Sequence, residues 1–226
     1  MAHLNQTGTS LEQFEKLFDN VNLTYFIVAP TCQDRIKNQD ETDIDCGGTE
    51  CSECSLNKAC LVNSDCFTND CSTSSKTCTV KSGIPRGGGG GSPFNDLNVI
   101  GSYGRTIPTS IIVRSGILID AIQVTYETSN QTQGSVVTQA PVRGRTSGTQ
   151  HRFDLLPGET IVTVSGRSAG TVIGLQFTTS TGRVSSYYGD YDGTAFTEQY
   201  SGYVLSYISG RCADALDQIQ FVWIRG

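Results

Sequence analysis

The sequence predicts an all-β domain preceded by a small disulfide-rich module, and two observations support this division. Eight of the nine cysteines lie between Cys32 and Cys78. From Asn98 to Gly226, short runs of alternating or β-branched residues recur roughly every ten residues, separated by Gly, Asn, Asp and Pro turns. Helical periodicity is absent from this part. About 140 residues of short antiparallel strands are expected to form a sandwich, barrel or prism.

The N-terminal segment, residues 1–31, is predicted to contain one short amphipathic helix. Within residues 9–22 the apolar side chains fall at helical spacing, at Leu11, Phe14, Leu17, Phe18 and Val21. The run from Ser10 to Gln13 fits a capping box at the start of this helix. Because so short a helix is marginal alone, we expect it to pack on the cysteine-rich module or to belong to a preceding domain.

Residues 32–78 are polar and loop-like, with too few large apolar residues for a core. Their cysteines follow the spacing C-x13-C-x4-C-x2-C-x5-C-x5-C-x4-C-x6-C. A module this small needs covalent staples, so we expect disulfides among Cys32, Cys46, Cys51, Cys54, Cys60, Cys66, Cys71 and Cys78. The alternative is a zinc site at Cys51 and Cys54, but neither a second C-x2-C pair nor a nearby histidine accompanies them. Eight cysteines allow roughly a hundred connectivities, and the sequence does not choose among them.

An acidic run within this module, Asn38–Gly48, offers two interpretations. Its carboxylates, Asp40, Glu41, Asp43 and Asp45, are hard oxygen ligands of the kind that Ca²⁺ prefers. They could equally form a solvated turn that caps backbone N–H groups, since the full calcium-loop pattern is missing. The stretch resembles a small extracellular cysteine-rich module of the D-E-T-D-x-D-C-G-G type. That resemblance implies an accessory role and no chemistry of its own.

Residues 79–86 are expected to form a linker, and a run of five glycines, Gly87–Gly91, follows it. The run could itself be a flexible linker. It could instead open the second domain, residues 87–226, as one wall of a ligand site, because glycine takes positive φ freely and lets backbone N–H groups approach a ligand. Beyond it, strands are expected at Ser110–Arg114, Leu118–Tyr126, Ser135–Thr138, Thr160–Ser165, Thr171–Thr178, Val204–Ile208 and Asp217–Ile224.

Four motifs follow one another in the second half of the chain. They are the glycine-rich opening Gly87–Asp96, the strand pair Ile111–Tyr126 with its I-D-x-I-Q-x-x-Y pattern, the turns Val164–Gly166 and Tyr188–Gly193, and the ending Ser209–Ile219. In this order they resemble the jacalin-related lectin domain over residues 84–226. The resemblance implies a β-prism of type I, with three four-stranded Greek-key sheets around a pseudo-threefold axis.

The same resemblance implies a carbohydrate site at one end of the prism, where the glycine loop meets a G-x-x-x-D loop. Carried over by position, the Asp217 carboxylate accepts from two neighbouring sugar hydroxyls, while backbone N–H groups of Gly91, Asp214 and Ala215 donate to sugar oxygens. Such a site needs no metal and no catalytic pair. The rim of the site is implied for the loop formed by Ser168, Ala169 and Gly170.

One position departs from the family's motif, because Ala213 stands where the family has glycine. A site that needs positive φ would strain an alanine. An out-of-register match, Gly210-x-x-x-Asp214, satisfies the letters of the motif and makes Asp214 the alternative carboxylate. Asp217 is preferred, because the residues after it keep the family's spacing into the last strand. The neighbouring Cys212 replaces a serine of the family, as a buried small residue, an interchain bridge or the partner of an odd cysteine.

Composition excludes several classes of function. The formal charge is −6, with −5 in residues 1–86 (7 Lys/Arg, 12 Asp/Glu) and −1 in residues 87–226 (9 against 10). Without a basic stripe, nucleic acid is not an expected partner, and no apolar run is long enough to span a membrane. The histidines, His3 and His151, are isolated in sequence, and Asp214 with Asp217 on one short turn is not the facing pair of a glycosidase. An enzyme is therefore not expected.

The resulting prediction is a secreted lectin that recognises a hexose on glycans or glycoproteins. Eight clustered cysteines favour an oxidising compartment, and three N-x-[ST] sequons, at Asn5, Asn22 and Asn130, agree. Galactose-binding members of the family are cut in the glycine loop, whereas this chain is continuous through Pro85–Gly87, which favours mannose or glucose; cleavage before Gly87 would favour galactose. A structural or adhesive extracellular protein is the alternative. Weak single sites would gain avidity from a homo-oligomer.

Overall fold

The computed structural model describes residues 31–130 and 134–226. The helix predicted at residues 9–22 lies outside these ranges. The chain divides into Met1–Thr31 and Cys32–Gly226, and the second unit carries all the elements described below. Among the described residues, no helix has the length and apolarity needed to cross a bilayer.

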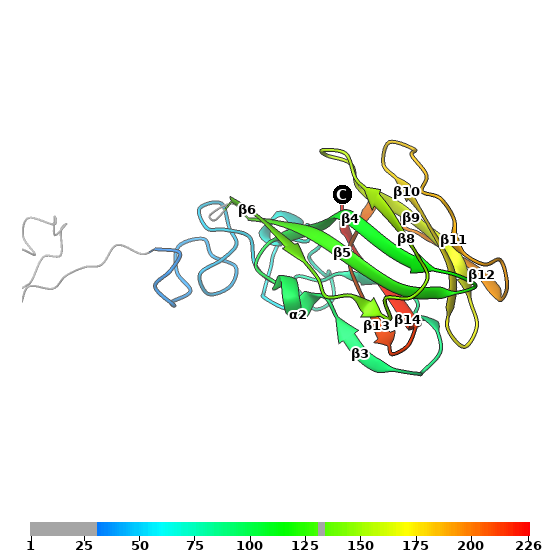
Figure 1. Ribbon diagram of the computed structural model, residues 1–226. Coiled ribbons are helices and arrows are strands. Elements are labelled where there is room, and N and C mark those ends of the chain that lie inside the picture. The colour runs from blue at the N-terminus through cyan, green and yellow to red at the C-terminus, as the bar shows by residue number, and fades with distance from the viewer. Residues whose placement is uncertain (1–30, 131–133) are drawn as a thin grey trace, which may run out of the picture. The chain divides into compact units, whose positions relative to one another are not determined.

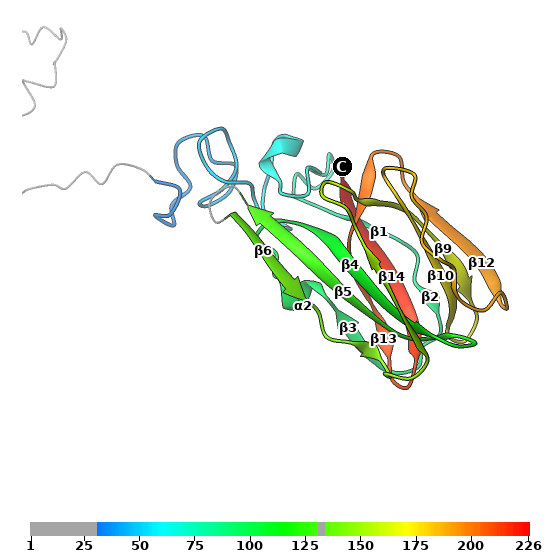
Figure 2. The same cartoon turned by 45° about the horizontal axis from the view of Figure 1, so that its top comes forward.

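Three antiparallel sheets make up the prism, and each is built on a path of four strands (Figures 1 and 2). The first sheet has the order β1 (Lys81–Ser82), β14 (Leu216–Arg225), β13 (Tyr203–Cys212), β3 (Ser92–Asn95), with β2 (Arg86–Gly87) also on β14. The second has the order β6 (Gly134–Gln139), β5 (Ile119–Asn130), β4 (Arg105–Ser115), β8 (Thr149–Asp154), with β7 (Arg143–Gly144) also on β5. The third has the order β11 (Tyr188–Gly189), β10 (Val172–Thr179), β9 (Ile161–Ser168), β12 (Thr194–Gln199).

Each sheet has Greek-key connectivity. In the second sheet β8 returns beside β4, and in the third β12 returns beside β9, so the fourth strand lies next to the first. The first sheet has the same layout, but its strands come from both ends of the domain's sequence. Strands β1, β2 and β3 come from its start, and the β13–β14 hairpin comes from its end. The expected three-sheet β-prism is confirmed.

Each of the seven predicted strand regions matches a strand of the structure, at β4, β5, β6, β9, β10, β13 and β14, although Leu118, Thr160 and Thr171 lie one residue before β5, β9 and β10. The patterns missed β8 and β12, which are edge strands with burial in only one or two positions, such as Phe153 and Phe196. Their remaining side chains are mostly polar and face solvent, so period-2 alternation is faint. The very short strands β1, β2, β3, β7 and β11 also carry no pattern that sequence could show.

The core lies between the three sheets. Strand β4 alternates buried and half-buried side chains along most of its length, as a strand with one face on a core must. The largest fully buried side chains are Trp223, Tyr126, Phe177 and Phe221. Since they come from β14, β5 and β10, all three sheets contribute to one apolar cluster.

Residues 79–86, expected as a linker, are hydrogen-bonded to the prism. Lys81 pairs with Trp223, and Arg86 pairs with Ile219, so this stretch forms a broken edge strand along β14. Between the two short strands, the buried carboxylate of Glu198 accepts from the Ile84 N–H at 3.1 Å. The chain therefore enters the glycine loop from a fixed position.

The cysteine-rich module is held by four disulfides: Cys32–Cys51, Cys46–Cys54, Cys60–Cys71 and Cys66–Cys78. The prediction of four bridges is confirmed. The alternative zinc site is wrong, because Cys51 and Cys54 are each bonded to another cysteine. The only helical element of the module is a single 3-10 turn, η1 (Asn63–Asp65). A second short helix, α2 (Leu97–Ile100), follows β3 in the prism.

Candidate functional site

The glycine loop and the last hairpin meet at one end of the first sheet. Strand β13 turns into β14 through residues 213–215, where the Ala213 N–H donates to the Ala215 carbonyl at 3.1 Å (Figure 2, red). Cys212, the last residue of β13, pairs with Ser92 of β3. On the other side, Gly87 of β2 pairs with Gln218 of β14. Residues 88–91 must therefore cross the sheet's end beside the hairpin.

Asp217 faces the last two glycines of this loop. A Cβ built on Gly90 would lie 2.6 Å from Asp217 Oδ1, and one on Gly91 would lie 2.5 Å from Oδ2. Gly91 also has a φ of +63°, in the left-handed region that glycine adopts without strain. Only glycines at these two positions let the backbone approach the carboxylate this closely.

One oxygen of that carboxylate is buried without a partner. Asp217 Oδ2 is shielded from solvent, and no hydrogen bond from the described residues reaches it. A buried carboxylate oxygen without a donor is costly, and most buried polar atoms in proteins are satisfied. The other oxygen, Oδ1, also accepts no hydrogen bond from the described residues but is not shielded from solvent, so it is the atom of this carboxylate that a ligand's hydroxyl can reach directly.

Arg211 fixes the glycine loop from outside. Its Nε donates to the Gly90 carbonyl at 2.9 Å, and its Nη2 donates to the Gly91 carbonyl at 2.7 Å. At the start of the loop, the Gly88 N–H donates to the Asp217 carbonyl at 2.9 Å. Five glycines in a row would otherwise be flexible, so these bonds turn the run into an ordered wall. The interpretation as a flexible linker is wrong.

The two candidate carboxylates occupy different places. Asp217 lies on β14 and faces the loop, whereas the Asp214 side chain is 83% exposed in the turn and forms an ion pair with Arg145 at 2.5 Å. The structure thus brings Asp217, and not Asp214, against Gly90 and Gly91. Asp214 and Ala215 still place their backbone in the hairpin beside the loop.

Ala213 is not strained. Within the described part of the chain, the non-glycine residues with positive φ all lie between Arg35 and Lys76, so Ala213 has an ordinary backbone conformation. The loss of the family's glycine at this position therefore does not distort the turn.

The predicted rim loop also lies at the site. It connects β9 to β10, and the Ala169 N–H donates to the Thr171 carbonyl at 2.9 Å. A Cβ on Gly88 would collide with the carbonyl oxygen of Gly170, so these two backbones are in direct contact. Ala169 and Gly170 therefore adjoin the start of the glycine loop.

Sequence reasoning missed two arginines and underrated one glycine. Arg211 holds the loop and Arg145 approaches Asp214 from the second sheet, while Gly90 contacts Asp217 as closely as Gly91 does. One signal for Arg211 was available, because an arginine also stands at the equivalent position before the other two hairpins, at Arg114 and Arg167. Arg145 carried no such signal.

Cys212 is a free thiol, half-buried beside Gly91. Since all other cysteines are paired within the module, it has no intrachain partner.

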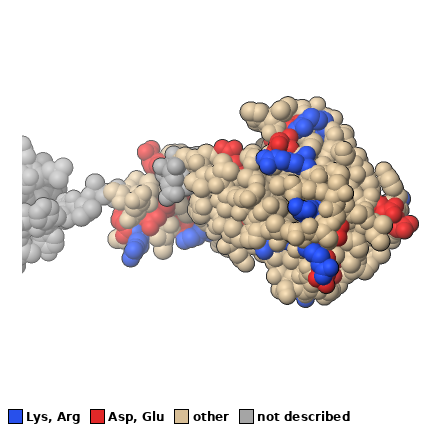
Figure 3. Space-filling model, in the orientation of Figure 1, with Lys and Arg blue, Asp and Glu red and all other residues tan. Residues whose placement is uncertain are grey.

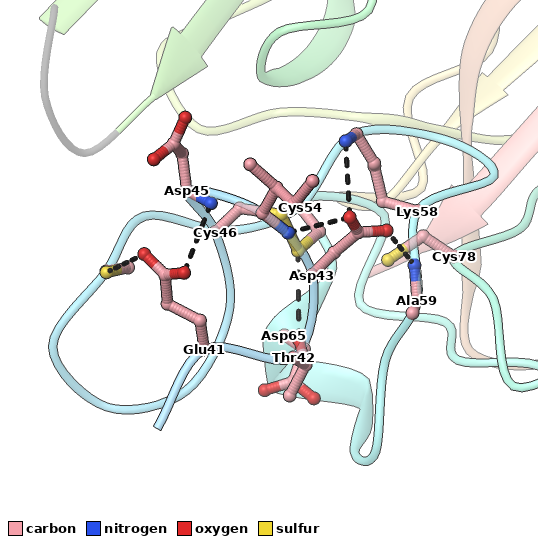
Figure 4. Close-up of a disulfide and its surroundings, with 12 residues drawn as sticks. Glu41, Thr42, Asp43, Asp45, Cys46, Cys54, Lys58, Ala59, Asp65 and Cys78 are labelled. Carbon is pink, nitrogen blue, oxygen red and sulfur yellow. Dashed lines mark hydrogen bonds and ion pairs between the residues drawn. A yellow bond between two sulfur atoms is a disulfide. The ribbon is translucent and has the colours of Figure 1, made fainter. Parts of the chain in front are cut away.

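The acidic run of the module does not assemble into a calcium site (Figure 4). Glu41 accepts from the N–H groups of Asn38 and Asp45, and Asp40 accepts from Thr49. Asp43 accepts from the Ala59 N–H at 2.7 Å and pairs with Lys58. Among the described residues, the two clusters of convergent ligand atoms consist of disulfide cysteines and, in one, Glu41. The interpretation as a capping turn is therefore the one that the structure supports.

These hydrogen bonds also lower the pKa of two carboxyl groups in the acidic run. The hydrogen bond from the Thr49 hydroxyl, with that from its N–H, lowers the pKa of Asp40. Partial burial opposes ionisation of Asp43, but the N–H groups of Ala59 and Ile44 and the ammonium of Lys58 outweigh it and lower the pKa of that carboxyl. Both groups are negatively charged at neutral pH and bind the module's own backbone.

Comparisons with known proteins match the prism. The family model of the jacalin-like lectin domain matches residues 84–222. Among solved structures, a mannose-binding jacalin-related lectin from Ananas comosus is 22% identical with a TM-score of 0.56, covering 65% of this chain and 99% of that one. A mannose-binding lectin from champedak is 28% identical with a TM-score of 0.55, covering 64% and 96%. Malaysian banana lectin is 25% identical with a TM-score of 0.54, covering 66% and 100%. No curated protein matches the chain.

The similar structures are covered almost completely, so the resemblance spans a whole domain rather than a fragment. A lectin domain binds its ligand without transforming it, and the expectation that the chain is not an enzyme is confirmed on that ground. Together, the three Greek-key sheets, the ordered glycine loop and the match over residues 84–222 show that the chain belongs to the jacalin-like lectin family.

Proposed function

We propose that this protein binds a hexose of extracellular glycans at the end of the prism where Asp217 faces the glycine loop. The observation that carries the proposal is the half-buried Asp217 carboxylate, which faces Gly90 and Gly91 and accepts no hydrogen bond from the described residues. A hexose offers adjacent hydroxyls that donate to both oxygens of one carboxylate. Backbone N–H groups of Gly91, Asp214 and Ala215 are the proposed donors to sugar oxygens, and Ala169 and Gly170 form the rim.

The proposed site works without a metal. Its elements are one carboxylate and a backbone loop held by Arg211, and these supply both the acceptors and the donors that a hydroxyl-rich ligand requires. Charge-assisted hydrogen bonds to the carboxylate are the strongest contacts expected.

Mannose or glucose is the proposed sugar type. The lectin from champedak, 28% identical, is described as mannose-binding. The glycine loop here is also protected from the cleavage that would free an amine at Gly87. Arg86 is held in β2 opposite Ile219, and its Nε lies 3.5 Å from the buried Glu198 carboxylate. A protease needs an accessible, extended segment, and this one is paired in a sheet.

A secreted location is proposed from the module. Four disulfides in residues 32–78 form and persist in oxidising compartments. On the face drawn in Figure 3, basic side chains of the prism lie in a loose row with acidic ones beside some of them. Residues 87–226 have 9 Lys/Arg against 10 Asp/Glu, and this lack of net positive charge fits a partner other than nucleic acid.

The test is binding of methyl α-mannoside and of a glycan array by the full chain and two variants. Asp217→Ala should weaken binding at least about tenfold, because a charge-assisted acceptor is lost. Asp214→Ala is the matched control: it removes an exposed carboxylate from the same hairpin but leaves the backbone N–H, so binding should change less than about threefold. Fluorescence of Trp223, buried in the core, verifies folding of each variant.

Addition of EDTA should leave the affinity unchanged. If the wild-type chain retains no sugar on any array, the lectin proposal falls, and a role in protein contacts takes its place. If Asp214→Ala abolishes binding while Asp217→Ala does not, the carboxylate assignment is wrong.

A further inference from the structure

A buried carboxylate outside the proposed sugar site, that of Glu198, contacts the segment that leads into the glycine loop. Glu198 belongs to β12, an edge strand of the third sheet, and is 3% exposed. Its Oε1 accepts from the Ile84 N–H at 3.1 Å and lies 3.5 Å from Arg86 Nε, and its Oε2 accepts from Trp223 Nε1 at 3.4 Å. A carboxylate this buried requires partners, and these come from residues 79–86 and from the first sheet.

Both oxygens of this carboxylate face donors, so the position requires two acceptors. Donors of the segment meet Oε1, and the indole N–H of Trp223 meets Oε2. A glutamine has one acceptor oxygen and one NH2 donor group. In either orientation its amide nitrogen would face a donor, and one of the contacts would be lost. Glutamate, unlike its isosteric amide, can therefore hold the segment and β14 at the same time.

The Glu198 carboxylate acts where the pairing of the segment with β14 is interrupted. Strands β1 and β2 both pair with β14, and residues 83–85 lie between them. In this interval Pro85 has no N–H to donate, and the Ile84 side chain is 59% exposed, so apolar packing contributes little. The Ile84 N–H donates to Glu198, whose carboxylate replaces the acceptor that a continuous strand pair would supply.

Gly83 lets the segment come this close. A Cβ built on Gly83 would collide with Glu198 Oε2 and lie 3.0 Å from the Phe221 carbonyl oxygen. The Gly83 N–H donates to that carbonyl at 2.8 Å. Since its φ is outside the left-handed region, Gly83 is needed for space rather than for conformation. The backbone of the segment thus lies directly against the Glu198 carboxylate.

The start of the glycine loop depends on such contacts, because β2 is too short to fix its own register. It consists of Arg86 and Gly87, and only glycines follow through residue 91. Register is weakly specified in a glycine-rich strand, where no side chains distinguish one pairing from the next. The observed register is the one that lets the Gly88 N–H donate to the Asp217 carbonyl at 2.9 Å. Anchors outside β2 must therefore set it.

Strand β12 anchors Arg86 as well as Ile84. The Arg86 guanidinium lies over the Phe196 ring, 5.1 Å from its centroid, while its Nε faces Glu198. Phe196 and Glu198 are the buried side chains of β12. One edge strand of the third sheet therefore holds the residue from which the glycine loop departs. The far end of the loop is held from the first sheet, by Arg211.

We propose that Glu198 is a positioning residue of the proposed sugar site. From the third sheet it fixes the segment 79–86, sets the register of β2 and so places the start of the glycine loop against Asp217. It acts on the loop and makes no contact with the sugar itself. Its effect on binding rests on the proposed function, whereas its effect on the loop is independent of any ligand.

The first experiment measures amide hydrogen exchange at Gly88 by NMR in the unliganded full chain. Glu198→Gln should accelerate this exchange at least about tenfold, because a contact that holds the segment is lost. Gln199→Ala is the matched control: it truncates an exposed side chain of the same strand and should leave the exchange within about twofold of wild type.

A second variant approaches the same contact from the segment. Gly83→Ala places a methyl group against Glu198 Oε2 and leaves the side chains of the third sheet unchanged. It should also raise the exchange at Gly88, and it supplies the test if Glu198→Gln does not fold.

The second experiment measures the dissociation constant of methyl α-mannoside. Glu198→Gln should weaken binding about three- to thirtyfold, because the site is no longer preorganised. Phe177→Ala separates this effect from stability: it destabilises the core of the third sheet but should bind within about twofold of wild type at a temperature where it is folded. Arg86→Gln removes the contact at 3.5 Å and keeps the Ile84 bond, so its dissociation constant should lie between those of wild type and Glu198→Gln.

The outcomes separate the two proposals. If exchange at Gly88 and mannoside binding are both unchanged in Glu198→Gln and in Gly83→Ala, the positioning role is wrong while the proposed function stands. Faster exchange with an unchanged dissociation constant would also overturn it, as would equal loss of binding in Phe177→Ala. If exchange rises as expected but the wild-type chain binds no sugar on any array, the proposed function fails, while the control of the loop by Glu198 stands.

Discussion

Residues 32–78 and the prism that follows them are held together by different means. The module has four disulfides, and a cluster of buried cysteines takes the place of an apolar core. Its carboxylates accept hydrogen bonds from backbone N–H groups: Asp43 accepts from Ala59, and Asp65 accepts from Leu61. The prism has long hydrogen-bonded strand pairs and one apolar cluster, to which all three sheets contribute side chains.

Backbone conformation shows the same contrast. In the described residues, the six non-glycine residues with positive φ all belong to the module: Arg35, Gln39, Asp45, Asn57, Asn69 and Lys76. From Gly87 onward, every such position is a glycine. Covalent bridges and caps therefore hold residues in conformations that cost energy, whereas the corners of the prism use the residue that adopts them freely. Disulfides and capping hydrogen bonds therefore fix the backbone conformation of the module locally, whereas packing between the sheets fixes the structure of the prism.

The two regions meet at the end of the first sheet opposite the proposed sugar site. Tyr203, the first residue of β13, donates its hydroxyl to Asp70 at 2.7 Å, and the Arg225 N–H donates to the Thr68 carbonyl at 3.1 Å. Since β13 is ten residues long, about 33 Å of strand separates this contact from the hairpin at 213–215. The module does not touch the proposed binding end.

Reduction of the four disulfides should produce the largest difference between the two regions. Each bridge stabilises the module by roughly 2–4 kcal/mol, and no apolar core replaces it, so residues 32–78 should unfold while the prism keeps its sheets. Limited proteolysis should cut at Lys37 and Lys58 under reducing conditions only. Fluorescence of Trp223, the only tryptophan, should stay that of a buried indole. Loss of the buried signal together with the module would show that the prism depends on it.

A cavity in the core should destabilise the prism and leave the module intact, the opposite of reduction. Phe177→Ala removes a fully buried ring of the third sheet and should cost the prism about 3–5 kcal/mol. Urea denaturation followed by Trp223 fluorescence measures the loss. The module should keep its resistance to proteolysis, because its disulfides are intact. Val184→Ala, which truncates a side chain that is 52% exposed, is the control and should stay within about 0.5 kcal/mol of wild type. A loss below 1 kcal/mol in Phe177→Ala would contradict packing as the main support of the prism.

Within the prism, the carboxyl group of Glu159 has a strongly lowered pKa. The guanidinium of Arg183, with the hydroxyls of Thr179 and Thr181, holds the pKa of this carboxyl far below its ordinary value. A lowered pKa in the folded state means that the carboxylate stabilises the fold above its unfolded pKa of about 4.3 and that this contribution is lost as the pH falls. Glu159→Gln should therefore be about 1–3 kcal/mol less stable than wild type at pH 7.

The difference between the two proteins should shrink steadily below about pH 4. Thermal unfolding measured across pH checks this. Equal sensitivity to acid in Glu159→Gln and in wild type would show that other carboxylates account for the loss of stability at low pH.

The contact between the regions should give the smallest effect. Tyr203→Phe removes the hydroxyl that binds Asp70 and should cost about 0.5–1.5 kcal/mol. Hydrogen exchange should rise at the module's last disulfide loop, residues 66–78, and not at the glycine loop, residues 87–91. Tyr191→Phe, on an exposed ring of the third sheet, is the matched control. Altered mannoside binding in Tyr203→Phe would contradict the separation of the two ends.

Much of the fold was predictable because its signals are local. Strands β4 and β5 bury mainly one face, and β14 buries the four successive side chains of Phe221–Ile224, so their alternating or β-branched residues stand out. Strands β8 and β12 lie at sheet edges and bury little, so their sequences read as loop. The stretch 79–86 has no pattern at all, and only its hydrogen bonds to β14 make it part of the sheet.

The candidate site was predictable only in part. The glycine run and Asp217 came from the family resemblance, and the structure places them together. The choice between Asp214 and Asp217 required the hairpin, because a turn residue points to solvent and a strand residue faces a neighbour. Arg211 and Arg145 act across distances of about 120 and 70 residues along the chain, which no local pattern records.

The sequence by itself determined that one region would be cross-linked and the other packed, because cysteine spacing and apolar alternation are local properties. It also determined which positions could hold a close backbone turn, because only glycine adopts positive φ freely. The tertiary structure alone decided which cysteines pair and which carboxylate meets the glycine loop. These depend on contacts between residues far apart in the chain, which form only when the three sheets close on one core.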